Sequence, residues 1–503
     1  MFSLTQNYLT RGFWGDEAWT SLISQLPYVQ MLKTTAADFH PPGYYTIIEI
    51  LYKFVAPTEV NTRLVSIVFY LLTIFLVYKL ASYASGSFPP VILNDSEGSR
   101  DSSSSTQNDR KELLGLNNFG LISAVVVALN PIFFTYAFEA RNYTMFAFAA
   151  TGSIYYLVQL SEKFTKKTAA IFVLFSTLGI YTHYYMFFVL ASQFFYILLW
   201  DRKILLKMIG VFAIVGVSYL PWIPFLFTQL TSVGESYWIG GIDKRTHFEA
   251  ILRILGGEHK TIFRPILFWL SSVLVLTGII QHALRHPSTS RSTLREEPSG
   301  HSTVSAQSNR SDSMSSGPRF EKQYLLIWSW AIVPFILASL PGFRIGEFAL
   351  PYRPIFFWRY LIPASIPLAM VMVHTAQKFP KILMMIPIGS LILLSVAIDT
   401  DVFRRYPHSF KQVYANDVVP NIQSEDEIVT VLPSFAEVLY YRNQNHLENN
   451  LVVLEEGLVQ FSGKSLLDAN VENGVVQVRN PEANRYFEMR RGDSGPEAVV
   501  KNY

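Results

Sequence analysis

Long apolar runs separated by short basic segments are the main pattern along this chain of 503 residues. A run crosses a hydrocarbon core about 30 Å thick when it has about 20 helical residues. The runs of that length are 62–82, 116–136, 143–160, 204–228, 263–284, 323–341, 358–376 and 381–398. This pattern predicts a mainly α, polytopic membrane protein.

Residues 168–200 form one further apolar segment, which contains no Asp, Glu, Lys or Arg. As a single helix it would extend about 50 Å, which is too long for one crossing. We therefore expect two spans folded back on each other, with YTHYY, residues 181–185, at the turn. Because Lys and Arg cluster beyond both ends of the segment, the positive-inside rule places both ends in the cytoplasm and the turn outside.

Counting outward from this hairpin gives about ten transmembrane helices and three regions. Residues 1–59 are expected to form an extracytoplasmic acidic loop with interfacial helices, and 60–398 the transmembrane domain. The Ser-rich segments 94–112 and 285–318 have the composition of disordered cytoplasmic insertions. Residues 399–503 alternate short β-like runs with a helix-like run, which predicts a small extracytoplasmic α/β domain.

The segment 41–57 is the ambiguous element of this topology. It is short for a span and carries Glu49 and Lys53 in its middle. Charges at that position favour a helix lying in the membrane interface over a crossing. The acids before it then stay on the outer face.

The composition agrees with a membrane protein, since half of the residues are hydrophobic and only 16% are charged, below the usual quarter. The formal net charge of +3 is too small to indicate nucleic acid as a partner. There is no cysteine, which excludes disulfides, a thiolate nucleophile and Cys-ligated zinc.

This topology gathers several polar and aromatic residues on the outer face, at the ends of spans. They are Asp16 and Glu17, then His40, Pro41 and Pro42 in DFHPP, Glu139, Arg141 and Tyr143 in FEARNY, His183 and Tyr184 in YTHYY, and Arg359 and Tyr360 in FFWRY. A carboxylate there can act as a general base toward a hydroxyl or amine. Arginine and histidine can hold a phosphate whose lipid tail stays in the bilayer. The cluster therefore favours transfer from a lipid phosphate.

Each member of this cluster also has a purely structural interpretation. The acid pair can cap an interfacial helix. Arg141 and Arg359 can extend to lipid head groups, and His183 can be an ordinary hydrogen-bonded residue. A metal site that joins the acids to His40 and His183 lacks the i, i+4 ligand spacing. We therefore expect no cofactor, and a divalent cation is unsupported.

Six motifs in this order resemble the GT-C membrane glycosyltransferases of the protein mannosyltransferase and aminoarabinose transferase type. The motifs are WGDEAWTSL at 14–22, DFHPPGYY at 38–45, NTRLVSIV at 61–68, NPIFFTYAFEARNYTMF at 130–146, YTHYY at 181–185 and RYLIPASIP at 359–367. The resemblance implies transfer of a sugar from a polyprenyl-phosphate carrier to an acceptor on the extracytoplasmic face, in a plasma membrane protein of the cell envelope.

The resemblance also implies roles for individual residues. Asp16 matches the proposed catalytic base, and Glu17 supports the site. The HPP loop shapes the site, and the arginines of EARNY and FFWRY lie toward the donor phosphate or the acceptor groove. Inversion at the anomeric carbon suits one base without a covalent intermediate. Family members begin with a transmembrane helix, whereas only residues 1–15 precede Asp16 here; either the start is truncated or misassigned, or this variant lacks that helix.

Two other classes of function remain open from the sequence. One is a lipid or sugar transporter or flippase, although we find no internal repeat and the polar groups lie at span ends. The other is a non-catalytic partner of a related transferase. Mannose, glucose, galactose and amino sugars are all compatible with the sequence, as are protein, lipid and polysaccharide acceptors and any oligomeric state.

Overall fold

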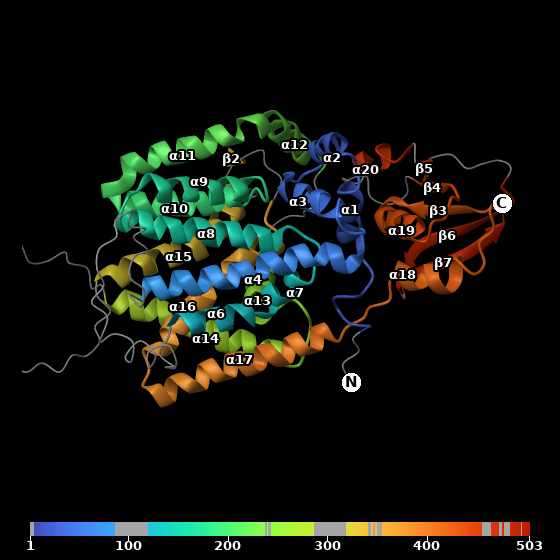
Figure 1. Ribbon diagram of the computed structural model, residues 1–503. Coiled ribbons are helices and arrows are strands. Elements are labelled where there is room, and N and C mark those ends of the chain that lie inside the picture. Colours follow the sequence, from blue (N-terminus) through green and yellow to red (C-terminus); the bar gives the residue numbers. More distant parts are fainter. Residues whose placement is uncertain are drawn as a thin grey trace, which may run out of the picture.

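A bundle of long helices forms most of the protein, as Figure 1 shows. The computed structural model describes residues 5–85, 119–236, 239, 243–285, 318–340, 344–345, 348–349, 355–454, 464–471, 475–476, 483–493 and 495–502. The insertion expected at 94–112 lies outside these residues, as does the one at 285–318 apart from its two end residues. The expected mainly helical fold is confirmed.

The helices of the bundle run side by side between its two ends (Figure 1). They are α4 (Glu59–Ala84), α8 (Tyr143–Glu162), α9 (Lys166–Ile180), α10 (Met186–Trp200), α11 (Leu205–Tyr219), α12 (Ile223–Ser236), α14 (Arg264–Arg285), α15 (Pro318–Ser339), α16 (Ser365–Gln377) and α17 (Lys381–Phe403). Short 3-10 helices, η1 (Arg202–Ile204), η2 (Leu220–Trp222) and η3 (Trp358–Ala364), precede α11, α12 and α16.

Four helical segments in the described part of the chain are long and apolar enough to cross a membrane. They are Glu59–Ala84, Arg202–Thr231, Arg264–Leu284 and Lys381–Phe403. A bent helix pair raises this number to five. The remaining predicted spans coincide with helices that are shorter or more polar, so the total of ten stays a prediction.

The run expected as one span at 116–136 is that bent pair. Helices α6 (Phe119–Ala128) and α7 (Pro131–Ala137) meet at an angle of 63°. Pro131 has no N–H to continue the first helix, and Asn130 caps the second by accepting a hydrogen bond of 3.2 Å from the Phe133 N–H. The Asn-Pro step therefore explains the break.

Two helices, α9 and α10, flank a turn at 181–185, as expected for the segment 168–200. That each of them crosses the membrane stays a prediction, since neither is among the helices long enough to span it. The ambiguous segment contains α3 (Gly43–Tyr52), whose ten residues extend only about 15 Å and cannot cross a membrane. With α1 (Gly15–Ile23) and α2 (Tyr28–Ala36), α3 lies at one end of the bundle (Figure 1).

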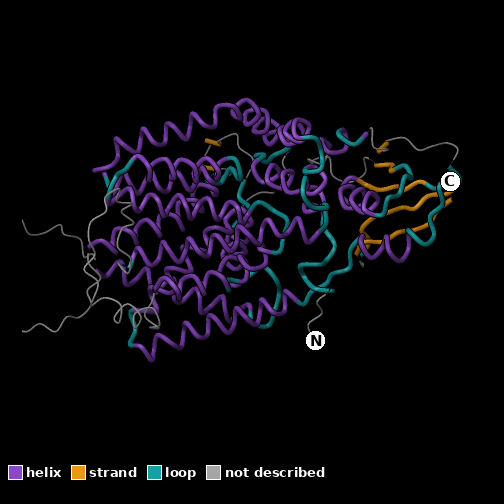
Figure 2. The backbone as a smooth tube through the Cα atoms, in the orientation of Figure 1, coloured by secondary structure: helices purple, strands orange, loops and turns teal. Residues whose placement is uncertain are grey.

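The C-terminal residues form a five-stranded sheet with helices beside it, at the same end of the molecule as α1 (Figure 2). The strand order is β5-β4-β3-β6-β7, with β3 (Glu427–Val431), β4 (Leu451–Leu454), β5 (Val475–Val476), β6 (Arg485–Gly492) and β7 (Gly495–Asn502). The pairing is parallel except between β6 and β7. The helices are α18 (Phe410–Val413), a π-helical turn (Tyr414–Val418), α19 (Leu432–Gln444) and α20 (Lys464–Asp468). Helix α17 runs to Phe403, five residues past its expected end.

The N-terminal helices share one hydrophobic core with the C-terminal sheet and its helices. Helix α1 packs against α19, and Phe13 and Phe435 are both fully buried in this core. The Phe13 N–H donates a 2.7 Å hydrogen bond to the Tyr441 hydroxyl. A Cβ at Gly12 would lie 2.1 Å from Ser409 Oγ, so any larger residue there would displace the Ser409 side chain. These contacts fix the position of α1.

One further helix and a pair of short strands in the described part of the chain lie outside the bundle helices and the C-terminal sheet. Helix α13 (Lys244–Gly256) packs against η3 and α14, and β1 (Arg344–Ile345) pairs with β2 (Phe348–Ala349) as a short antiparallel ladder.

Candidate active site

Asp16 lies in the first turn of α1 with 40% of its side chain exposed. Its Oδ2 is 3.7 Å from Arg141 Nη2 and 3.9 Å from Arg359 Nη1. The helix has Trp14 as its N-cap and no side-chain cap. The acids therefore do not cap α1, and Asp16 is an accessible carboxylate between two guanidinium groups.

Glu17 has a different environment, since its side chain is fully buried. Arg63 Nε and Nη2 donate to its two oxygens at 2.8 and 2.7 Å, and the Ala140 N–H donates at 2.9 Å. Burial raises the pKa of Glu17, but the charges of Arg11 and Arg63 outweigh it and hold that pKa below its usual range. Glu17 is therefore an ionised anchor for α1.

Arg141 connects Asp16 to the HPP loop. Its Nη1 donates to the Asp16 carbonyl oxygen at 3.3 Å, and its Nη2 lies 3.4 Å from His40 Nε2. Because a guanidinium only donates, Nε2 of His40 accepts, and its Nδ1–H donates to Asp38 at 3.1 Å. A chain of polar contacts thus runs from Asp38 through His40 and Arg141 to Asp16.

The backbone of the HPP loop is fixed to the hairpin turn. The Gly43 N–H donates a 2.7 Å hydrogen bond to the Tyr181 carbonyl oxygen. A Cβ at Gly43 would lie 2.6 Å from that oxygen, so a side chain cannot be placed there without moving backbone. Asn142 Nδ2 donates to the carbonyl oxygen of Thr182 at 2.8 Å. Three predicted motifs therefore meet at one junction.

His183 is buried within this junction. Its ring stacks on Phe146 with a centroid distance of 5.0 Å and lies 4.8 Å from the ring of Tyr360. Its Nδ1 accepts the N–H of Tyr185 at 3.1 Å. Burial lowers the pKa of His183 well below its ordinary value. At neutral pH the ring is uncharged and can serve a phosphate as a hydrogen-bond donor through Nε2, but not as a cation.

Arg359 is stacked among aromatic rings at the start of η3. Its guanidinium lies 4.9 Å from the ring centroid of Trp14 and 5.4 Å from that of Trp358. Its Nη2 is 3.9 Å from the carboxylate of Glu258, which also contacts Arg253 at 3.6 Å. Arg359 therefore lies between two carboxylates, Asp16 and Glu258.

Glu139 does not face the exposed part of the site. Its carboxylate accepts hydrogen bonds from the Tyr8 hydroxyl at 2.9 Å and from Trp14 Nε1 at 3.2 Å, and it contacts Arg11 at 3.4 Å. Burial, the charge of Glu17 and that of Glu258 raise the pKa of Glu139 to about 7, although Arg11 opposes the shift. Glu139 holds the N-terminal segment beside the site.

An apolar cavity of about 280 Å³ adjoins these groups. Its wall includes five of the predicted residues together with several phenylalanines: His40, Pro41, His183, Tyr184, Tyr360, Phe39, Phe187 and Phe188. The Tyr184 hydroxyl donates a hydrogen bond to Gln229 Oε1 and accepts one from Trp222 Nε1 at 3.2 Å. The cavity meets the polar contacts of the site at His40, which lines its wall and lies 3.4 Å from Arg141 Nη2.

The two remaining predicted residues lie close by. Tyr143 is buried with its ring 6.0 Å from the Arg141 guanidinium. Pro42 precedes α3 and lines a separate apolar cavity of about 540 Å³. The described residues contain no group of three or more His, Cys, Asp or Glu side chains placed to hold a metal ion.

Sequence reasoning missed several residues of the site. Arg11 and Arg63 bind Glu17, and Asp38 orients His40. Glu258 follows α13 in a segment without a recognised motif. Only its place between the predicted spans 204–228 and 263–284 could have indicated Glu258.

Comparison with known proteins identifies the fold. No protein-family model and no curated protein sequence matches the chain. Among solved structures, it is similar to the aminoarabinose transferase ArnT from Cupriavidus metallidurans in the apo state, with a TM-score of 0.55 and 10% identity over 95% of this chain and 89% of that one. The same transferase bound to undecaprenyl phosphate gives a TM-score of 0.60 and 10% identity over 97% and 94%. The resemblance to the GT-C aminoarabinose transferases is confirmed at the level of the fold.

Proposed function

We propose that this protein is an inverting glycosyltransferase of the plasma membrane that moves a sugar from polyprenyl phosphate to an extracytoplasmic acceptor. One observation carries the proposal: an exposed carboxylate, Asp16, lies between Arg141 and Arg359 beside an apolar cavity. The fold supports it, because a structure with the same fold was solved with undecaprenyl phosphate bound.

In the proposed reaction Asp16 takes the proton from a hydroxyl or amine of the acceptor. The acceptor atom attacks the anomeric carbon from the face opposite the phosphate, and the bond from that carbon to the phosphate oxygen breaks. The leaving polyprenyl phosphate keeps the electron pair. Arg141 and Arg359 stabilise its charge, and the neutral His183 adds a hydrogen bond.

A single displacement requires one base, and Asp16 is the more exposed of the two carboxylates beside Arg359, at 40% against 18% for Glu258. A retaining glycosidase, by contrast, uses a second carboxylate about 5–5.5 Å from the first to form a covalent intermediate. The neighbouring Glu17 is fully buried and binds Arg63 through both oxygens. It cannot reach a sugar, so inversion is the expected outcome.

We also propose an orientation of the chain in the membrane. The site, α1 to α3 and the C-terminal domain lie at one end of the bundle, which we assign to the extracytoplasmic side (Figure 1). The turn at 181–185 lies at that end, because Gly43 binds Tyr181. Two basic residues at the start of α9, Lys166 and Lys167, then face the cytoplasm, as the positive-inside rule requires.

Donor profiling of the purified chain tests the proposal. Synthetic polyprenyl phosphates carrying mannose, glucose, galactose or aminoarabinose are supplied in detergent, with candidate acceptors. We expect release of polyprenyl phosphate from at least one donor and a new glycosidic bond of inverted configuration by NMR. Movement of labelled lipid across vesicles without any new glycosidic bond would instead support a transporter and contradict the proposal.

A further inference from the structure

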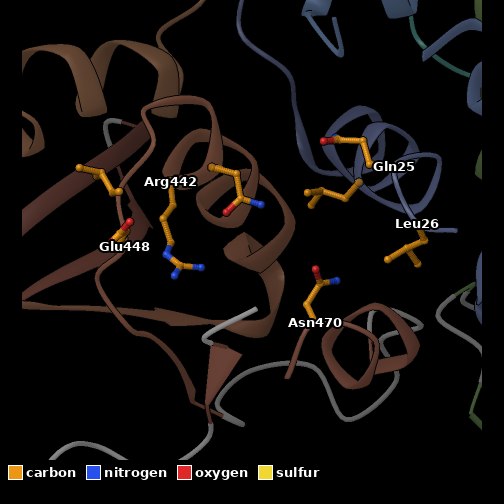
Figure 3. Close-up of a pocket in the computed structure, with 8 residues that line it drawn as sticks. Gln25, Leu26, Arg442, Glu448 and Asn470 are labelled. Atoms are coloured by element: carbon orange, nitrogen blue, oxygen red, sulfur yellow. The ribbon is translucent and has the colours of Figure 1, made fainter. Parts of the chain in front are cut away.

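A cavity with polar and apolar walls, separate from the one beside Asp16, lies between α1 and the C-terminal domain (Figure 3). Its volume of about 530 Å³ falls within the range of about 300–1,000 Å³ that holds small ligands. The turn after α1 supplies Gln25 and Leu26, and α19 with the loop after it supplies Arg442 and Glu448. Asn470, after α20, completes the labelled wall (Figure 3).

Hydrogen bonds between the N-terminal helices and the C-terminal domain hold these walls in place. Gln30 Nε2, on α2, donates to the carbonyl oxygen of Ala469 at 3.2 Å. The Tyr440 hydroxyl, on α19, donates to the Pro57 carbonyl oxygen at 2.8 Å. Because both sides are fixed in this way, the cavity is a formed feature of the interface.

The chemistry of the walls is mixed. The Arg442 guanidinium and the Asn443 amide carry N–H donors, and the Glu448 carboxylate and Gln25 Oε1 are acceptors. The Asn470 amide donates to the carbonyl oxygen of Leu466 at 2.8 Å. Three leucines, at positions 22, 26 and 447, provide apolar contact. A ligand that matches this wall must donate hydrogen bonds, accept hydrogen bonds and present a surface of C–H groups.

A saccharide ring meets all three requirements, because its hydroxyls both donate and accept and its ring faces carry C–H groups. A simple anion would meet the negative charge of Glu448 as well as the positive charge of Arg442. Extended peptides are commonly bound along a strand edge, and none of the described residues that line this cavity belongs to a strand. The wall therefore favours a neutral or zwitterionic sugar.

We propose that this cavity binds a saccharide portion of the acceptor. The inference rests on the proposed glycosyl transfer. Gln25 follows Asp16 by nine positions, which corresponds to about 14 Å along a helix. The bound sugar thus belongs to a part of the acceptor remote from the reacting group, and α1 connects the base to the turn that lines this cavity.

The test is equilibrium binding of mono- and disaccharide methyl glycosides of hexoses, pentoses and amino sugars to the full-length purified chain, followed by saturation-transfer NMR. Gln25→Ala and Glu448→Ala change exposed side chains and leave the core intact. We expect at least one glycoside to bind and each variant to weaken it about tenfold, the loss of roughly one hydrogen bond. Gln423→Ala and Glu425→Ala, exposed in the same domain, should bind normally.

Binding needs no donor, so its outcome is independent of the transfer assay. Absence of glycoside binding would overturn the inference, as would equal affinity in the cavity variants and their controls. Binding of a serine-containing peptide or of inorganic phosphate that depends on Glu448, without glycoside binding, would also overturn it. Failure of transfer from every polyprenyl-phosphate donor, with glycoside binding intact, would count against the proposed function alone.

Discussion

Replacing Arg63 by methionine should lower the free energy of unfolding more than any substitution of a surface residue does. The Arg63 side chain is fully buried. It binds both oxygens of Glu17 and donates to the carbonyl oxygens of Leu9 and Arg11, each at 2.7 Å. Removing one member of a buried ion pair costs about 3–5 kcal/mol, because the other charge stays buried. We expect a loss of that size for Arg63→Met.

A double-mutant cycle with Glu17→Gln tests the reason for this loss. Each single substitution leaves one buried charge without its main partner, whereas Glu17→Gln/Arg63→Met removes both charges. The double variant should therefore be less destabilised than the sum of the single ones, by about 0.5–3 kcal/mol. Reversible unfolding in mixed detergent micelles measures all four free energies.

The exposed Arg202 provides the control, and Arg202→Met should change stability by less than about 0.5 kcal/mol. A loss below about 1 kcal/mol for Arg63→Met would refute the reasoning, since a charge left in a buried site costs more than that. Strict additivity of Arg63→Met and Glu17→Gln would refute it as well. Either result would mean that Glu17 does not anchor α1.

Three further outcomes are expected. Gly43→Ala should lower the free energy of unfolding by about 1–3 kcal/mol and slow sugar transfer, because its Cβ meets the Tyr181 carbonyl oxygen. Thermal unfolding and a transfer assay measure the two effects. Normal values for both would contradict the tight junction. The pKa of Glu139 is about 7 in the folded state and about 4.3 in the unfolded state. Between pH 4.3 and pH 7 this carboxyl group is therefore protonated in the folded state and ionised in the unfolded state. The contribution of Glu139 to the free energy of unfolding should then be largest below pH 4.3 and fall toward pH 7 by up to about 4 kcal/mol. Glu139→Gln should remove this part of the pH dependence, and a pH profile identical to that of the unchanged chain would contradict the assignment. In the Cys-free chain, Glu425→Cys should react with an impermeant thiol reagent from outside the cell and Lys167→Cys should not, and the reverse labelling would overturn the orientation.

The helical hairpin and the gathering of the motifs could be predicted from sequence for identifiable reasons. A charge-free segment of that length has no other arrangement in a bilayer than two helices. The Asn-Pro step at 130–131 is a local signal, and it could have located the break between α6 and α7.

The environments of the site residues could not be predicted, because they depend on partners far along the chain. Asp16 and Glu17 are adjacent, yet one is 40% exposed and the other fully buried. The difference comes from Arg63, which is 46 residues away from Glu17. Glu258 reaches Arg359 only through the packing of α13 against η3. No short motif encodes such contacts.

The central claim is that Asp16 is the base of a sugar transfer, and one measurement tests it most directly. Formation of a glycosidic bond from a polyprenyl-phosphate sugar is compared for the unchanged chain, Asp16→Asn and the control Asp417→Asn, an exposed acid in the C-terminal part. We predict that Asp16→Asn lowers kcat by about 10²–10⁴ with unchanged thermal stability, and that the control is fully active. Full activity of folded Asp16→Asn would contradict the account.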